Sequence, residues 1–176
     1  MKATGIVRRI DDLGRVVIPK EIRRTMRIRE GDPLEIFTSG DGEVIFKKYS
    51  PMGEMSSFST DYAAVLAEAT RLAVIICDRD RCIAAGGVSK RDLLEKSVTI
   101  ELEKIADERR LFTAKDGEAY AVDGCERKIC VAMPIISAGD IAGTVVLLEN
   151  DGCDTTSDTD IKLAEVAAKF LGTRIE

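Results

Sequence analysis

Four cationic side chains recur near the N-terminus at a spacing that would place them on one face of a helix. They are Lys20, Arg23, Arg24 and Arg27, at positions i, i+3, i+4 and i+7 of the segment that follows Pro19. Like charges at this density repel one another, and a polyanion would supply the missing counter-charge. The spacing therefore favours a surface that binds nucleic acid.

Three more arginines, Arg8, Arg9 and Arg15, precede this segment. Residues 1–29 hold 9 basic and 3 acidic residues, a net charge of +6, although the whole chain has a net charge of −5. Residues 51–176 hold 15 basic and 23 acidic residues, a net charge of −8. A basic segment on an acidic body predicts a polyanion site at one end of the chain.

The composition of the basic segment favours duplex DNA among the nucleic acids. Arginine outnumbers lysine, and a guanidinium group can grip a phosphate or a guanine edge with two hydrogen bonds. No aromatic residue occurs before Phe37, so the sequence does not support base stacking, by which proteins bind single strands and RNA loops. Two other interpretations stay open: a solvated cationic face, and a site for an acidic protein, as in an antitoxin that binds a toxin.

The elements that must position these residues are short. Residues 4–10 and 15–18 are rich in β-branched side chains and flank a turn signal at residues 11–14, which predicts two strands. A helix from Pro19 to about Met26 follows, and a hairpin is predicted over residues 34–38 and 44–48. About 50 residues with one short helix enclose little core, so residues 1–50 are expected to form an obligate dimer with intertwined hairpins.

The rest of the chain predicts a second domain. Residues 51–57 combine proline, glycine and small polar residues and are expected to be a linker. Residues 58–176 predict an α+β domain with a central, mostly antiparallel sheet. The last helix is apolar over almost half its surface, so it packs on its own sheet, contributes to a dimer interface, or does both. Helices are expected over residues 61–71, 89–110 and 158–172, and strands over residues 72–78, 82–85, 119–122, 128–135 and 141–149.

Several classes of protein are disfavoured by what the sequence lacks. No apolar run approaches the ~20 residues that span a bilayer, and no signal segment is present, which predicts a cytoplasmic protein with no membrane partner. Histidine is absent, which removes imidazole ligands and histidine-dependent catalysis. No catalytic residue, metal site or cofactor is therefore expected.

Five cysteines are expected to be reduced, because their number is odd and no export signal precedes them. Cys77 with Cys82 and Cys125 with Cys130 share a C-x₄-C spacing that does not suit zinc. Buried core thiols are the expected interpretation. A redox-active pair, or a thiol enzyme, is the alternative.

The run from Thr4 to Phe37, and above all LGRVVIPKEIRR over residues 13–24, resembles the AbrB family of bacterial transition-state regulators. The resemblance implies a swapped-hairpin, β-barrel-like unit in which two chains interleave to bind DNA. The family recognises DNA with loose sequence rules, which fits backbone contacts combined with DNA shape. The DNA-contacting arginines of the family fall on Arg8, Arg15, Arg23 and Arg24, and Arg9 keeps a basic family position.

The strand order of residues 58–176 and the run CVAMPIISAGDIAGTVVLLEN over residues 130–150 resemble a GAF domain, an α/β sandwich. That resemblance implies dimerisation or the sensing of an unidentified small molecule, but no pocket residue carries over. The whole chain resembles one AbrB-family member that controls sporulation. It implies a homotetramer that activates and represses late genes in the forespore, and thus a transcription regulator rather than an enzyme.

Overall fold

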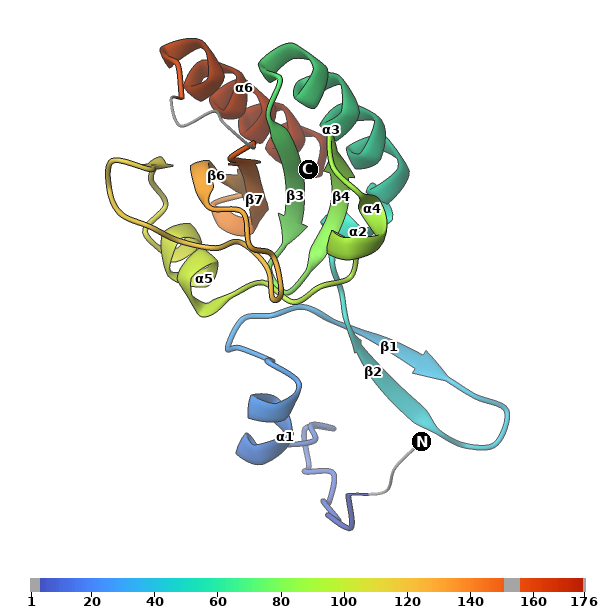
Figure 1. Ribbon diagram of the computed structural model, residues 1–176. Helices are drawn as coiled ribbons and strands as arrows, with labels where there is room; N and C mark the ends of the chain where they lie inside the picture. The colour runs from blue at the N-terminus through green and yellow to red at the C-terminus, as the bar shows by residue number, and fades with distance from the viewer. Residues whose placement is uncertain (1–3, 151–155, 176) are drawn as a thin grey trace. The chain divides into compact units, whose positions relative to one another are not determined.

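The computed structural model describes residues 4–150 and 156–175. The chain divides into two compact units, Met1–Tyr49 and Ser50–Glu176. Helices and strands mix in an α+β fold, as the sequence predicts (Figure 1). In chain order the elements are α1 (Lys20–Thr25), β1 (Leu34–Thr38), β2 (Val44–Lys48), α2 (Pro51–Glu54), α3 (Ser56–Thr70), β3 (Ala73–Asp78), β4 (Cys82–Gly86), α4 (Lys90–Leu93), α5 (Ile100–Asp107), β5 (Phe112–Thr113), β6 (Ile129–Ser137), β7 (Asp140–Leu148) and α6 (Asp158–Ile175).

The described residues of the N-terminal unit form one hairpin, at the predicted position. Strands β1 and β2 pair antiparallel, with Leu34 opposite Lys48 and Thr38 opposite Val44. The backbone N–H of Ser39 donates to the carbonyl of Glu43 at 3.1 Å and closes the loop between the strands. This two-stranded sheet gains no further strand within the described part of the chain.

The two strands predicted over residues 4–10 and 15–18 are not formed. A strand requires a hydrogen-bonded neighbour, and the described part of one chain offers none to these segments. Only Pro19 is buried among the described residues of this unit. Val7, Leu13 and Val17 are 89%, 71% and 69% exposed. The β-branched pattern of the sequence therefore stays unsatisfied within a single chain.

The C-terminal unit is built on a five-stranded sheet in the order β4-β3-β7-β6-β5. Every neighbouring pair is antiparallel, which confirms the predicted antiparallel sheet. Helices α3 and α6 cover one face, and α4, α5 and the segment around residues 119–122 cover the other (Figure 1). Strand β3 is buried at every residue, because both of its faces are covered.

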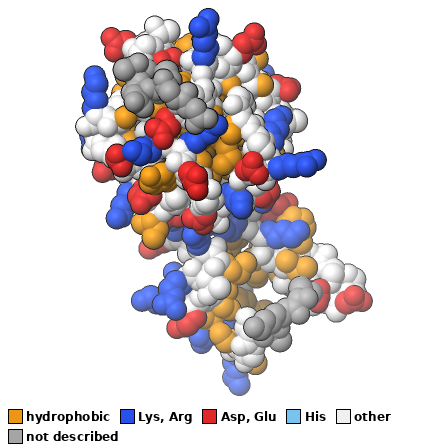
Figure 2. Space-filling view, viewed as in Figure 1, with side chains coloured by type: hydrophobic (Ala, Val, Ile, Leu, Met, Phe, Trp, Pro, Cys, Tyr) orange, Lys and Arg blue, Asp and Glu red, His pale blue; other side chains and the backbone are white. Residues whose placement is uncertain are grey.

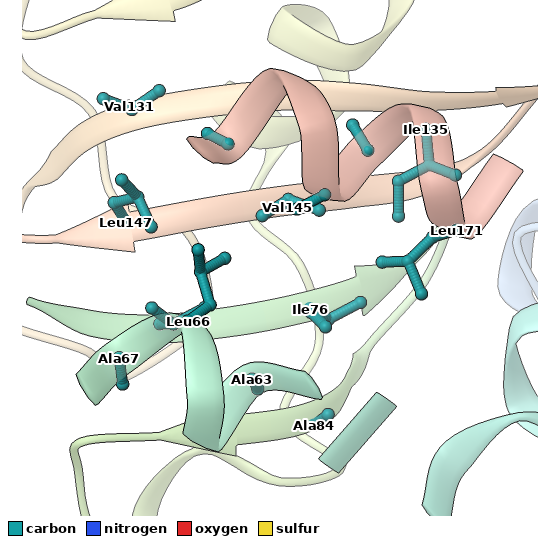
Figure 3. Close-up of a cluster of buried hydrophobic side chains, with 14 of the residues drawn as sticks. Ala63, Leu66, Ala67, Ile76, Ala84, Val131, Ile135, Val145, Leu147 and Leu171 are labelled. Atoms are coloured by element: carbon teal, nitrogen blue, oxygen red, sulfur yellow. The ribbon is translucent and has the colours of Figure 1, made fainter. Parts of the chain in front are cut away.

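The core beneath α3 and α6 is closely packed (Figure 3). Leu66 of α3 and Leu171 of α6 point toward Ile76 of β3 and the neighbouring strands (Figure 3). Two glycines permit the close approach of helix to sheet: a Cβ on Gly86 would lie 2.2 Å from the carbonyl oxygen of Ala63, and one on Gly172 would lie 2.3 Å from that of Ile136. Larger residues at these two positions would force the layers apart.

Residues 51–57, expected to be a linker, are largely helical instead. Helix α2 starts at Pro51, where the missing N–H of proline is tolerated. The side chain of Ser50 caps α2 by accepting from the N–H of Gly53 at 3.1 Å. Met52 is fully buried in the cluster beneath α3 and α6. The proline, glycine and serine residues therefore mark a helix start that packs on the C-terminal unit.

The helix predicted over residues 89–110 is interrupted. Glu95 has a φ of +64°, and Ser97 forms an antiparallel bridge with Arg81, just before β4. The N–H of Cys82 donates to the carbonyl of Lys96 at 2.9 Å, and the N–H of Glu95 donates to the carbonyl of Cys82 at 2.9 Å. Thr99 then starts a new helix by accepting from the N–H of Leu102 at 3.1 Å. Pairing with β4 thus overrides local helix propensity.

Candidate nucleic-acid interface

Arg15 stands at the end of a tight, well-bonded turn. The Asp11 carboxylate accepts from the N–H of Leu13 at 3.0 Å, from the N–H of Arg15 at 2.7 Å and from the Arg15 guanidinium at 2.8 Å. These bonds, led by the one from the Arg15 N–H, lower the pKa of Asp11. Gly14 supplies the positive φ, +76°, that the turn requires. The predicted turn is therefore formed, and it holds the Arg15 backbone in place.

Helix α1 presents three of the predicted cations. Lys20, Arg23 and Arg24 are exposed and share one face, and α1 buries no residue. Within the residues that the structure describes, their side chains form no ion pair. Pro19 precedes the helix, and its carbonyl accepts from the N–H of Arg23 at 3.0 Å.

Arg27 is exposed but lies beyond the end of α1, so the predicted extension of the helical face to this residue is wrong. Its φ of +50° places it in the left-handed region. The N–H of Arg27 donates to the carbonyl of Arg24 at 3.2 Å, and the N–H of Ile28 donates to that of Arg23 at 2.7 Å, which closes the helix end. Arg27 therefore occupies a position that glycine usually fills.

Arg8 and Arg9 precede the turn and are exposed, as are all seven predicted site residues. In the described part of the chain, neither side chain forms an ion pair. Figure 2 shows Lys and Arg side chains standing out from the N-terminal unit among exposed hydrophobic side chains. The structure thus places the cations on three consecutive segments: residues 4–10, the end of the turn, and α1 with its C-terminal cap.

Two supporting residues escaped the sequence analysis. Asp11 orients the guanidinium of Arg15, and the i, i+4 spacing of these two residues could have predicted their ion pair. Lys48 of β2 donates to the carbonyl of Arg27 at 2.8 Å and lies 3.6 Å from the carboxylate of Asp32. These contacts join the end of α1 to the hairpin across 21 residues of sequence. No local sequence pattern predicts this pairing.

The C-terminal unit has a cavity of about 730 Å³. Polar groups converge on it from α4 and from the ends of β6 and β7, among them Ser89, Asp92, Glu126 and Arg127. The Arg127 guanidinium donates to the side-chain oxygen of Asn150 at 2.7 Å, which holds it at the cavity wall. A small polar molecule would find both charged signs and hydrogen-bonding groups here.

The described residues offer few other kinds of site. Among them, no group of acids and cysteines could hold a metal ion. No helix in the described ranges is long and apolar enough to cross a membrane. Cys77, Cys82 and Cys130 are buried, as expected for core thiols, and Cys125 is partly buried. The fifth cysteine, Cys153, lies outside the described residues.

The N-terminal unit is similar to known DNA-recognition and antitoxin domains. Residues 7–53 match the family described as "Antidote-toxin recognition MazE, bacterial antitoxin". The solved N-terminal DNA recognition domain of AbrB from Bacillus subtilis is 61% identical, over 29% of this chain and 94% of that chain, with a TM-score of 0.26. The transition state regulatory protein AbrB of Bacillus subtilis is 61% identical over 29% of this chain and 52% of that protein, which confirms the AbrB resemblance of this unit.

The C-terminal unit and the full length complete the assignment. Residues 54–176 match the family described as "Stage V sporulation protein T C-terminal, transcription factor". Stage V sporulation protein T of Bacillus subtilis is 50% identical over 100% of this chain and 99% of that protein. The chain belongs to the stage V sporulation protein T family, which confirms the prediction of a regulator rather than an enzyme.

The GAF resemblance of the C-terminal unit is confirmed at the level of the fold. The C-terminal unit is similar to the GAF domain of a phosphoenolpyruvate-protein phosphotransferase from Acinetobacter. The match spans 73% of this chain and 84% of that chain, with a TM-score of 0.56. Sequence identity in this comparison is 13%. The similarity therefore establishes the sandwich and transfers no ligand and no pocket residue.

Proposed function

We propose that this chain is a transcription regulator that binds duplex DNA through the basic residues of its N-terminal unit. The observation that carries the proposal is a set of exposed cations, five of which have no acidic partner in the described part of the chain: Arg8, Arg9, Lys20, Arg23 and Arg24. The counter-charge they lack is what a phosphate backbone supplies. The binding residues proposed are Arg8, Arg9, Arg15, Lys20, Arg23, Arg24 and Arg27.

The similar domain of AbrB supports duplex DNA as the target. That domain is named a DNA recognition domain, and it is 61% identical to the N-terminal unit. Phosphate contacts position such a protein on DNA, and contacts with base edges or with DNA shape give it preference for a sequence. Arg15, whose guanidinium is already oriented by Asp11, is best placed for a geometrically demanding contact.

We infer that the DNA-binding unit is a homodimer. A unit of this size that buries only Pro19 among its described residues cannot be stable alone, because burial of apolar surface drives folding. The exposed side chains of Val7, Leu13 and Val17 fit the pairing of residues 4–10 and 15–18 with a second chain. A symmetric dimer would also present every cation twice.

The C-terminal unit is proposed to join two such dimers into a homotetramer. Phe58, Tyr62 and Phe170 form an aromatic cluster on α3 and α6, with ring centroids 5.6 to 6.0 Å apart. Val65 and Val166 extend the same helices' surface and are 65% and 59% exposed. Two linked DNA-binding dimers would gain effective concentration on paired sites, which would sharpen the choice of promoter.

The GAF-like unit is further proposed to modulate DNA binding through a small molecule held in the cavity beside Arg127. Such a molecule can act only if it binds two states of the assembly unequally. From family membership we propose that the regulated genes are late sporulation genes in the forespore. Their activation or repression would depend on where the bound site lies relative to each promoter.

The proposal is tested by fluorescence anisotropy of labelled duplex DNA with the full chain. Arg23→Ala and Arg24→Ala are each expected to weaken binding across DNA sequences, because each removes a cation without disturbing buried residues. Arg91→Ala, an exposed arginine of the C-terminal unit, is the matched control and should bind as the wild type does. Equal affinity of all four proteins would contradict the proposed interface.

A second candidate is an antitoxin-like role, in which the same face binds an acidic protein. The match of residues 7–53 to the MazE family favours it. Its difficulty is the folded C-terminal unit, because such antitoxins usually wrap their toxin with a disordered tail. Capture of an acidic protein by the wild type, but not by Arg24→Ala, together with absence of duplex DNA binding, would favour this role.

A further inference from the structure

Three of the described cysteines gather on one side of the sheet. Cys77 of β3 and Cys82 of β4 belong to the cluster beneath α4 and α5, and Cys125 packs against the same cluster. Cys130 lies in the other cluster, beneath α3 and α6. The DNA-binding proposal uses none of these thiols.

A β-bulge brings the first two thiols face to face. Ile76 pairs with Ala84, but Cys77 pairs with Cys82, so Ile83 is the extra residue of β4. Ile83 and Ala84 both face the α3 side, and Cys82 therefore turns to the α5 side together with Cys77. Without the bulge the alternation of the strands would place the two thiols differently.

The backbone at this pair suits a cross-strand disulfide. The N–H and carbonyl of Cys82 bond to Lys96 and Glu95, so Cys77 and Cys82 form a pair without mutual backbone hydrogen bonds. Such pairs have Cα atoms about 4.5 Å apart. That separation falls within the range of about 4.4 to 6.8 Å that disulfides span. A disulfide could therefore form here with little backbone movement.

A small oxidant in solution cannot reach the thiols of Cys77 and Cys82 directly, so another group has to react with it first. Cys77 and Cys82 are fully buried. Hydrogen bonding with Cys82, followed by burial, raises the pKa of Cys77 well above its ordinary range, so its reactive thiolate is rare. Cys125, by contrast, is partly exposed and lines the cavity of about 730 Å³. It is the thiol of this group that a small oxidant can reach first.

We propose that Cys77, Cys82 and Cys125 form a thiol oxidation site, in which a hydroperoxide oxidises Cys125 and the oxidation ends as a Cys77–Cys82 disulfide. The Sγ thiolate of Cys125 attacks one peroxide oxygen, the O–O bond breaks, and Cys125 becomes a sulfenic acid while the other oxygen leaves as water or alcohol. One thiol of the pair then attacks the Cys125 Sγ, and water leaves. The other thiol attacks the mixed disulfide and returns Cys125 as a thiol. Two thiols lose two electrons in total, and the peroxide gains them.

The disulfide would close the turn between β3 and β4. In that turn the Asp78 carboxylate accepts from the N–H groups of Asp80 and Arg81, both at 2.8 Å. It also accepts from the hydroxyl of Ser50 at 2.9 Å, and Ser50 is the first residue of the C-terminal unit. Oxidation would thus lock the turn that fixes the start of this unit.

The test uses the full chain, fully reduced and then exposed to hydrogen peroxide. After the remaining thiols are blocked in denaturant, trypsin cleaves at Arg79 and Arg81 and separates Cys77 from Cys82. We expect a linked pair of peptides, residues 72–79 with residues 82–90, that disappears on reduction. Cys125→Ser should slow its formation about tenfold or more, because the buried pair then lacks an accessible relay thiol.

Matched variants make the outcome decisive. Cys130→Ala removes a buried thiol from the other side of the sheet and should leave the linked peptides unchanged. Cys77→Ala should leave Cys125 trapped as a sulfenic acid or in a mixed disulfide with Cys82. The proposal fails if peroxide yields only over-oxidised Cys125 or a Cys125–Cys130 link in the wild type. The relay fails if Cys125→Ser forms the Cys77–Cys82 link at the wild-type rate.

Discussion

The two units of this chain use apolar residues in opposite ways. The C-terminal unit buries its apolar side chains in two clusters, one on each side of a single sheet. Among the described residues of the N-terminal unit only Pro19 is buried, and Val7 and Val17 are largely exposed. Both units are nevertheless patterned by β-branched residues. The same pattern thus encodes a core within one chain in the C-terminal unit, and in the N-terminal unit we propose that it encodes an interface with a second chain.

The contrast also separates stability from function. Residues that hold the C-terminal unit together lie far in sequence from the proposed DNA-binding cations. The N-terminal unit, in turn, carries its charges on short segments that are organised by turns and caps, such as Asp11 with Arg15. Substitutions in the C-terminal unit should therefore change the free energy of unfolding, and substitutions in the N-terminal unit should change association, which depends on protein concentration.

The largest effect is expected from Leu171→Ala. Leu171 is fully buried between α6 and the sheet, so its truncation leaves a cavity that the rigid sheet cannot fill. We expect the free energy of unfolding of the C-terminal unit to fall by about 2–5 kcal/mol, measured by denaturant titration. Ile100→Ala, at an exposed position of α5, is the control and should change it by less than about 0.5 kcal/mol.

Gly86→Ala is expected to cost about 1–3 kcal/mol in the same titration. The new Cβ would lie 2.2 Å from the backbone carbonyl oxygen of Ala63, so α3 would have to move away from β4. Gly53→Ala serves as the control, because its Cβ meets only the Ser50 side chain at 3.5 Å within α2. A variant at Gly86 as stable as the wild type would show that the close approach of α3 is not needed.

Val17→Ala tests whether the exposed apolar residues of the N-terminal unit are buried by a second chain. If Val17 is buried against a second chain, losing two methyl groups should cost about 1–2 kcal/mol of association per chain. Sedimentation of the full chain should then show dissociation at higher protein concentration than for the wild type. Association unchanged by Val17→Ala, with Ile100→Ala as the reference, would mean that this face is not part of the dimer.

The smallest effect concerns the pH dependence of the turn at Asp11. Because the pKa of Asp11 is lowered in the folded chain, the stabilisation of the turn is present above the ordinary carboxyl pKa and is lost as pH falls through the lowered value. The largest cause is the N–H of Arg15, not its guanidinium. NMR titration should therefore show that Arg15→Ala raises the pKa of Asp11 only part of the way back. A complete return would assign the shift to the guanidinium.

Much of the fold follows from local signals in the sequence. The apolar run that forms β3, Ala73–Asp78, and the turn residues between β6 and β7 are enough to predict these strands from the sequence. The errors lie where long-range pairing overrides local preference. Residues 95–98 leave the predicted helix because Glu95 and Lys96 bond to Cys82 of β4 and Val98 bonds to Asp80 of the preceding turn. Residues 51–57 are largely helical, and Met52 is buried under α3 and α6.

The candidate site was predictable in part for the same reason. Spacing alone places Lys20, Arg23 and Arg24 on one face of α1, since helical periodicity is local. Arg27 departs from that face because its N–H and that of Ile28 close the helix end. The facing thiols Cys77 and Cys82 depend on a bulge at Ile83, which a C-x₄-C spacing does not reveal.

The most direct test of the central claim is the salt dependence of duplex DNA binding by the full chain. If the N-terminal cations neutralise phosphates, the logarithm of the binding constant should fall with the logarithm of salt concentration by about 0.9 for each phosphate contacted. A slope of several units that drops clearly in the double variant Arg23→Ala, Arg24→Ala, and not in Arg91→Ala, is the predicted result. No binding at low salt by a folded oligomer, or a slope that the double variant leaves unchanged, would contradict the account.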